Sequence, residues 1–175
     1  MTRVLPFAGA ALGGALVLAL CLAVTGGGER KPAPAAVTTW SAPDGSYSIA
    51  TPRGWKAVAS GAAATVLQRT DKRGVVVIRR RAAVTGPLAS LARRLERRLR
   101  SQLADFEPAG ARLATVGGTQ GLVYTFVRPA ANRVQSVVVA PAGDRSYTLD
   151  LVADGDAPDV ARELAGMVRS FAPKS

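Results

Sequence analysis

The sequence contains no histidine and only one cysteine, Cys21. Histidine is the usual general base and the usual metal ligand near neutral pH, so its absence removes histidine-based hydrolases and most zinc sites. Cys21 lies inside an apolar N-terminal run, so the rest of the chain can form neither an internal disulfide nor a thiol site. Both absences argue against catalysis and against a disulfide-stapled fold.

Other catalytic arrangements also lack the residues they need. A serine nucleophile without histidine would require a lysine base, and Lys56 and Lys72 stand in turn-like, exposed positions. A calcium loop needs glycine at its sharp turn, and Gly155 comes too early among the aspartates for that pattern. We therefore expect no enzyme activity, no metal and no cofactor. The aspartates that suggested a calcium site are Asp150, Asp154, Asp156 and Asp159. We expect Asp156 instead to cap the helix that follows.

Aromatic residues make up only 5% of the chain although hydrophobic residues make up 48%, so Val, Leu and Ala must supply most of the core. The formal charge is +11, and residues 38–175 alone carry 20 cations against 11 anions, a net charge of +9. Such a balance favours association with anionic lipid, wall polymer or nucleic acid, but it says nothing about the fold.

The N-terminus carries one long uncharged run, Val4 to Thr25. At about 1.5 Å per residue, a helix of this length just spans a hydrocarbon core, whereas a secretory signal has a shorter apolar stretch. We expect residues 1–27 to be a membrane anchor or uncleaved signal and residues 28–37 to be a Gly- and Pro-rich linker. The charges flanking the run are nearly balanced, so they do not set its orientation.

Two alternatives to a retained anchor remain. Ala33-Pro34-Ala35 has the small-x-small pattern of a cleavage site. Cys21 follows Leu18-Ala19-Leu20, which is similar to a bacterial lipobox except that Leu20 replaces the small residue normally found before the cysteine.

Residues 38–175 predict an α+β domain with an antiparallel sheet and two main helices. Alternating apolar residues predict strands around residues 47–51, 64–70, 75–81, 122–126, 133–140 and 146–153. Leucines at three- and four-residue steps predict a helix from Pro87 to Phe106, and a second apolar stripe predicts a closing helix that ends near Phe171.

The first helix carries a dense set of arginines opposite or beside its leucine stripe. Helical geometry places Arg93, Arg97 and Arg100 directly away from that stripe and Arg94 and Arg98 on one flank. These five are candidates for docking on an anionic surface, and the alternative is an ordinary solvated face partly balanced by Glu96. Arg79-Arg80-Arg81 ends a strand, so its side chains alternate between faces and cannot form one patch. No nucleic-acid-binding motif accompanies the charge.

The stretch Tyr47 to Trp55 resembles the aromatic-x-hydrophobic-x-x-Pro-x-x-Trp opening of PsbP-like domains. Val116-Gly117-Gly118 before a strand and a terminal helix ending in Phe171 are also similar to this family. Within the family, the chain most resembles the LpqN-type lipoproteins of actinobacteria. The resemblance covers about Trp40 to Pro173. It implies an α/β/α sandwich, usually exported and membrane-attached, without shared catalytic residues.

We accordingly expect a single-pass protein of the cell membrane with its domain on the extracytoplasmic side. The expected function is that of a non-catalytic accessory module that binds an envelope protein, an anionic lipid or a wall polymer. The alternative is a carrier that holds a small apolar or lipid ligand in a groove between sheet and helices, which would need a cavity of about 300 Å³ or more.

Overall fold

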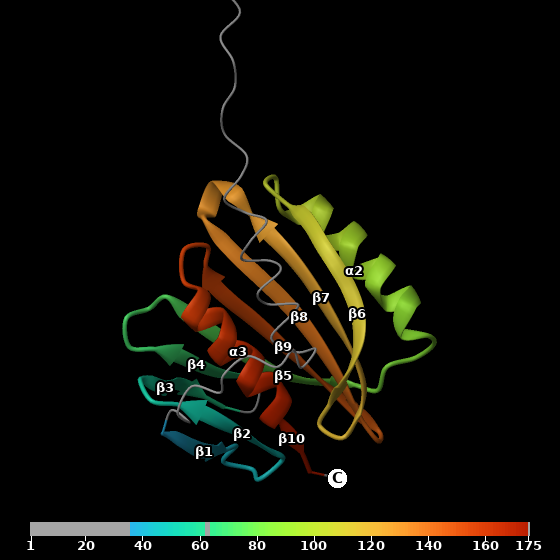
Figure 1. Cartoon of the computed structure of the whole chain (residues 1–175). Coiled ribbons are helices and arrows are strands. Elements are labelled where there is room, and N and C mark those ends of the chain that lie inside the picture. The colour runs from blue at the N-terminus through green and yellow to red at the C-terminus, as the bar shows by residue number, and fades with distance from the viewer. Residues whose placement is uncertain (1–35, 62–63, 175) are drawn as a thin grey trace, which may run out of the picture.

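The computed structural model describes residues 36–61 and 64–174. The predicted anchor, the predicted linker up to residue 35 and Cys21 lie outside the described residues. Within them, the structure has ten strands, two α-helices and a short 3₁₀ helix, η1 (Figure 1). The strands are β1 (Val37–Ser41), β2 (Tyr47–Pro52), β3 (Trp55–Ser60), β4 (Thr65–Arg69), β5 (Gly74–Ala82), β6 (Glu107–Val116), β7 (Thr119–Arg128), β8 (Arg133–Ala142), β9 (Arg145–Asp154) and β10 (Ala172–Pro173). The helices are α2 (Leu88–Gln102), η1 (Pro129–Ala131) and α3 (Pro158–Ser170).

Seven strands form one antiparallel sheet in the order β3-β4-β5-β9-β8-β7-β6. Hairpins join β3 to β4, β4 to β5, β6 to β7, β7 to β8 and β8 to β9. The long connection from β5 to β6 contains α2. It separates β5 from β6 in the sheet, and β9 takes the position beside β5. The strands predicted from alternation all lie in this sheet or in β2, which confirms the α+β prediction.

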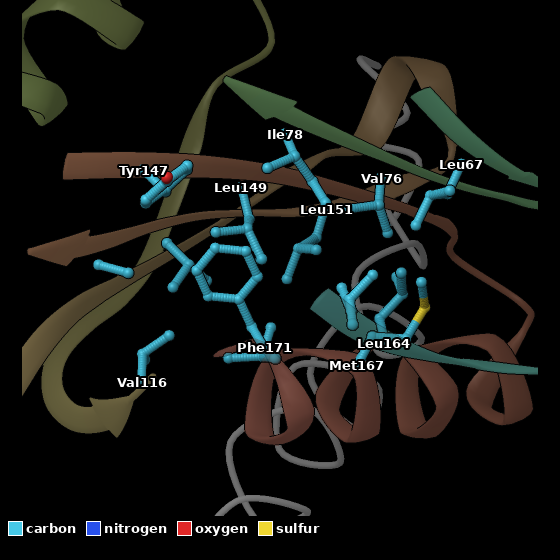
Figure 2. Packing of buried hydrophobic residues seen from close by; sticks show 14 of the residues in the cluster. Leu67, Val76, Ile78, Val116, Tyr147, Leu149, Leu151, Leu164, Met167 and Phe171 are labelled. Atoms are coloured by element: carbon cyan, nitrogen blue, oxygen red, sulfur yellow. The ribbon is translucent and has the colours of Figure 1, made fainter. Parts of the chain in front are cut away.

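One face of the large sheet packs against α3 and β2. Figure 2 shows Leu149 and Leu151 of β9 pointing toward Leu164, Met167 and Phe171 at the helix side. Gly74 lets this layer close, because a Cβ added there would lie 2.6 Å from Cγ1 of Val160. The closing helix thus buries its predicted stripe in the larger of the hydrophobic clusters.

The other face packs against α2, at the end of the sheet formed by β6, β7 and β8 (Figure 1). Leu122, Tyr124 and Phe126 alternate along β7 and meet the leucines of the helix. The two helices therefore cover opposite faces of the sheet, as in the predicted α/β/α sandwich.

A small sheet in the order β1-β2-β10 lies beside α3. Its strands are antiparallel, with Trp40 opposite Ile49 and Ala172 opposite Ser48. β1 begins at Val37, one residue before the predicted start of the domain.

Two predictions about local structure were wrong, and strand β6 was missed. α2 ends at Gln102 rather than Phe106, because Leu103 is extended and Phe106 turns back to pack on Tyr124 and Phe126. β6 was not predicted, since Pro108 and Gly110 occupy a register shift in it and obscure the alternation. Asp156 does not cap α3; Ala157 holds that position without a side-chain bond, and Arg73 binds Asp156 instead.

Candidate docking surface on helix α2

Helix α2 is fixed to the sheet by one apolar stripe. Leu88, Leu91, Leu95 and Leu99 are partly buried against the aromatic cluster formed by Phe106, Tyr124 and Phe126, and Ala92 of the same helix is buried. This anchoring determines which side of the helix faces water.

All five predicted arginines of α2 are exposed, with Arg93 and Arg97 facing directly away from the leucine stripe and Arg94 and Arg98 on one flank. None of these four takes part in an ion pair among the described residues; Arg93 makes one hydrogen bond of 3.2 Å to Oγ of Ser90. Their guanidinium groups are therefore not neutralised by close contact with acids of the described domain.

Arg100 behaves differently from the sequence-based prediction. Its Nη2 lies 3.0 Å from Oε1 of Glu96, and its guanidinium carbon lies 5.5 Å from the centre of the Phe106 ring. The early turn after α2 brings Phe106 under this flank, so Arg100 folds back over the ring rather than pointing directly away. The Arg100 side chain is exposed, but these two contacts hold it against α2 and Phe106.

Across the described domain, nearly all acids are engaged by arginines. Ten of the eleven acidic residues between 36 and 174 are in ion pairs, Glu107 being the exception. Arg69 holds the pKa of Asp159 below its ordinary value, and Arg128 does the same for Asp105. The positive excess of the domain is consequently concentrated where acids are missing, and α2 is the densest such place.

Arg79, Arg80 and Arg81 alternate between faces, as predicted. Arg79 forms an ion pair with Asp150 on the α2 side of the sheet, and Arg80 lies 3.7 Å from Asp44 on the opposite side. Burial raises the pKa of Asp150, while the charges of Arg79, Arg81 and Arg98 oppose that rise. Asp150 thus stands among three arginines, a convergence that sequence spacing could not reveal because Arg98 comes from α2.

The aspartates near α3 are held by arginines. Arg73 Nη2 lies 2.7 Å from Asp156 Oδ1, its Nε lies 3.7 Å from Asp154 Oδ2, and Arg69 Nη1 lies 2.6 Å from Asp159 Oδ2. No cluster of three metal-ligating side chains occurs in the part of the chain that the structure describes.

A pocket of about 240 Å³ lies between the β1–β2 turn, the β3–β4 hairpin and β5. Its described lining includes Ala42, Tyr47, Ile78 and Arg80 and no residue of α2 or α3. The interfaces between the sheet and both helices are filled by buried side chains. The pocket is therefore not the sheet–helix groove expected for the carrier alternative.

No helix within the described ranges is both long and apolar enough to span a bilayer. The predicted anchor at Val4 to Thr25 is outside those ranges.

No protein-family model and no curated protein sequence matches the chain. Solved structures do match in fold. Cyanobacterial PsbP from Synechocystis sp. PCC 6803 has a TM-score of 0.59 at 16% identity, covering 85% of this chain and 98% of its own. The Ran-binding protein Mog1p of Saccharomyces cerevisiae has a TM-score of 0.59 at 11% identity, covering 80% and 96%.

LpqN of Mycobacterium tuberculosis, a protein involved in cell envelope biogenesis, has a TM-score of 0.51 at 16% identity, covering 80% of this chain and 91% of its own. These likenesses extend over most of each chain and agree with the layered architecture of the described domain. The chain therefore has a PsbP-like fold, with structural similarity to LpqN.

Proposed function

We propose that this protein is a non-catalytic accessory module of the cell envelope that binds an anionic envelope component through Arg93, Arg94, Arg97 and Arg98. The observation that carries the proposal is the exposure of these four guanidinium groups on one helix, without ion pairs among the described residues. Cationic groups spaced along one surface add their attraction to a polyanion or an anionic bilayer, and salt weakens that attraction.

Two structural neighbours support this proposal, Mog1p for a binding role and LpqN for a role in the cell envelope. LpqN is described as acting in cell envelope biogenesis and Mog1p as a Ran-binding protein, and neither description names a reaction. We infer by this likeness that the domain is exported and held at the membrane by Val4 to Thr25. Protease added to cells with a permeabilised outer layer should then digest the domain while cytoplasmic markers survive.

Attachment through a retained helix has its own test. Replacing Cys21 with Ser should leave membrane fractionation and apparent mass unchanged. Release of the protein, or loss of fatty-acid labelling, would instead make Cys21 a lipidation site.

Docking can be measured with the fragment 36–175, whose folding is first checked by thermal melting. Each arginine near an anionic surface contributes about 1 kcal/mol, so Arg93→Gln combined with Arg97→Gln should weaken binding to phosphatidylglycerol vesicles by about 30-fold. The affinity should fall steeply between about 0.1 M and about 1 M salt, as the Debye length shrinks from about 10 Å to about 3 Å.

A matched control removes the same charge elsewhere. Arg133 and Arg162 are exposed and lie outside α2, so Arg133→Gln with Arg162→Gln should change binding by less than about threefold. Soluble polyphosphate, used as a second probe, separates a polymer site from a bilayer site. Equal losses in the two double variants would show that binding follows net charge alone, and the docking proposal would fail.

A further inference from the structure

Part of the large sheet is not covered by α2. Cross-strand pairing places Val66, Val77, Asp150 and Val137 in one row across β4, β5, β9 and β8. Val137 is buried in the hydrophobic cluster against which the leucines of α2 pack. The other residues of this row therefore lie on the α2 side of the sheet. The helix packs on the β6 end of the sheet, and the β4, β5 and β9 end of that face extends beyond it (Figure 1).

This uncovered area is apolar at its centre. The next row pairs Gln68 with Val75 and Val75 with Val152. We define the open sheet face as Val66, Val75, Val77 and Val152. All four side chains are partly exposed and none belongs to a buried hydrophobic cluster of the described domain. Four valines gathered on three neighbouring strands are suited to contact with apolar side chains of another molecule.

Arginines stand beside the open sheet face. Arg79 and Arg81 follow Val77 on the same side of β5, and the charge of Arg98, on the flank of α2, acts on Asp150 of the same row. Asp150 is the acid in this group, and Arg79 forms an ion pair with it. Arg81 and Arg98 have no ion-pair partner among the described residues, so the area has an excess positive charge next to its valines.

The shape of this region argues against a flat bilayer as its occupant. A helix with its side chains is about 10–12 Å across, so a bilayer resting on the outer side of α2 would stand well above the valines. A polyanion without apolar groups would leave the valines in water. An acidic protein segment with apolar side chains would match both the positive charge and the exposed valines. Its carboxylates would pair with Arg81 and Arg98 while its apolar groups cover the valines.

We propose that the open sheet face, together with Arg81 and Arg98, binds an acidic amphipathic segment of a partner protein. This site shares Arg98, on the flank of α2, with the docking surface, but the outward-facing Arg93 and Arg97 take no part in it. The module would therefore hold an envelope component with one surface and a protein with the other.

The probe is a fluorescein-labelled acidic peptide with leucine at helical spacing, and a scrambled peptide of identical composition serves as its reference. Anisotropy is measured with the full-length chain in neutral detergent. The patterned peptide should bind at least about tenfold more tightly than the scrambled one. Arg81→Gln with Arg98→Gln should weaken its binding by about tenfold, as should Val66→Thr with Val77→Thr, which keeps the side-chain shape but adds hydroxyls.

The matched control is Arg93→Gln with Arg97→Gln, which removes the same charge from the outer side of α2 and should alter peptide affinity by less than about twofold. The two valines are partly exposed and the two arginines are exposed, and an unchanged melting temperature verifies the folding of both double variants. Equal binding of the two peptides, or equal losses in both arginine pairs, would overturn the proposal. Displacement of the peptide by dihexanoyl phosphatidylglycerol but not by its choline counterpart would also overturn it, since a lipid headgroup would then occupy the site.

Discussion

Nε1 of Trp55 donates a hydrogen bond of 2.7 Å to Oε2 of Glu163, although 108 residues separate the two in sequence. The bond joins β3, an edge strand of the large sheet, to α3. Arg69 of β4 lies 3.7 Å from the same carboxylate oxygen, so β4 is connected to α3 at this point as well.

Replacing Trp55 with Phe should lower the free energy of unfolding by about 1–3 kcal/mol. The substitution removes the indole donor and leaves part of a buried volume empty. Glu163→Gln is the control, because its amide oxygen still accepts the bond from Trp55 while only the partly exposed contact with Arg69 is weakened. Chemical denaturation of both variants measures the difference, and equal losses would mean that charge, not the indole bond, holds β3 in place.

Gly74→Ala should destabilise the domain by about 1–3 kcal/mol through overpacking. The added Cβ would lie 2.6 Å from Cγ1 of Val160 and 2.7 Å from Cη2 of Trp55. Gly61→Ala is the matched control, since its added Cβ meets no described atom within 4 Å. The loss should become smaller when Val160→Ala is introduced with Gly74→Ala, and purely additive effects in this double-mutant cycle would contradict the steric explanation.

Tyr124 and Tyr147 should respond in opposite ways to replacement by Phe. The Tyr124 hydroxyl is buried without a hydrogen-bond partner among the described residues, so removing it should leave stability unchanged or raise it by about 1 kcal/mol. The Tyr147 hydroxyl donates to the Ser46 carbonyl at 3.2 Å, so Tyr147→Phe should cost about 1 kcal/mol. Thermal melts of the two variants give the comparison.

Tyr124 should also make the domain sensitive to alkali. Burial raises the pKa of Tyr124 from 10.0 to about 12, with the negative charge of Glu96 adding to the effect. The unfolded chain then loses this proton at lower pH than the folded chain, so stability should fall as the pH rises from about 10 toward about 12. Tyr124→Phe should lose less stability over that interval than the unsubstituted protein. An identical pH profile for the two proteins would show that other groups control alkaline unfolding.

Arg100→Gln should destabilise the domain by about 0.5–1 kcal/mol, whereas Arg97→Gln should have almost no effect. Arg100 pairs with Glu96 and lies over the ring of Phe106, while Arg97 is exposed. Chemical denaturation of the two single variants tests this difference. Because replacing Arg100 would also affect stability, Arg93 and Arg97 are the better substitutions for the docking experiment.

The elements that the sequence predicted well are those in which one face is buried along its whole length. The leucines of α2 and the alternation of Tyr147, Leu149 and Leu151 reflect burial at a fixed period, which is visible in a single sequence. The layered α+β architecture follows from these patterns.

The features that were missed depend on contacts between distant segments. The end of α2 is set by Phe106 packing on β7, and the role of Asp156 is set by Arg73, which lies 83 residues away. Likewise, Arg98 could be assigned to a flank of α2, but its interaction with Asp150 requires the strand order. Neither local propensity nor spacing contains this information.

The position of the small sheet also determines how the domain can be oriented. β1 and β10 border the same strand, β2, so both ends of the described domain lie in the small sheet, on the α3 side of the large sheet, with Val37 opposite Pro52 and Pro173 opposite Tyr47. Helix α2 lies on the opposite side (Figure 1). If the residues before Val37 anchor the domain to a membrane, α2 would lie on the side of the domain away from the anchor. The arginines of α2 would then face away from that membrane, and a label attached after Lys174 would lie on the side nearer to it.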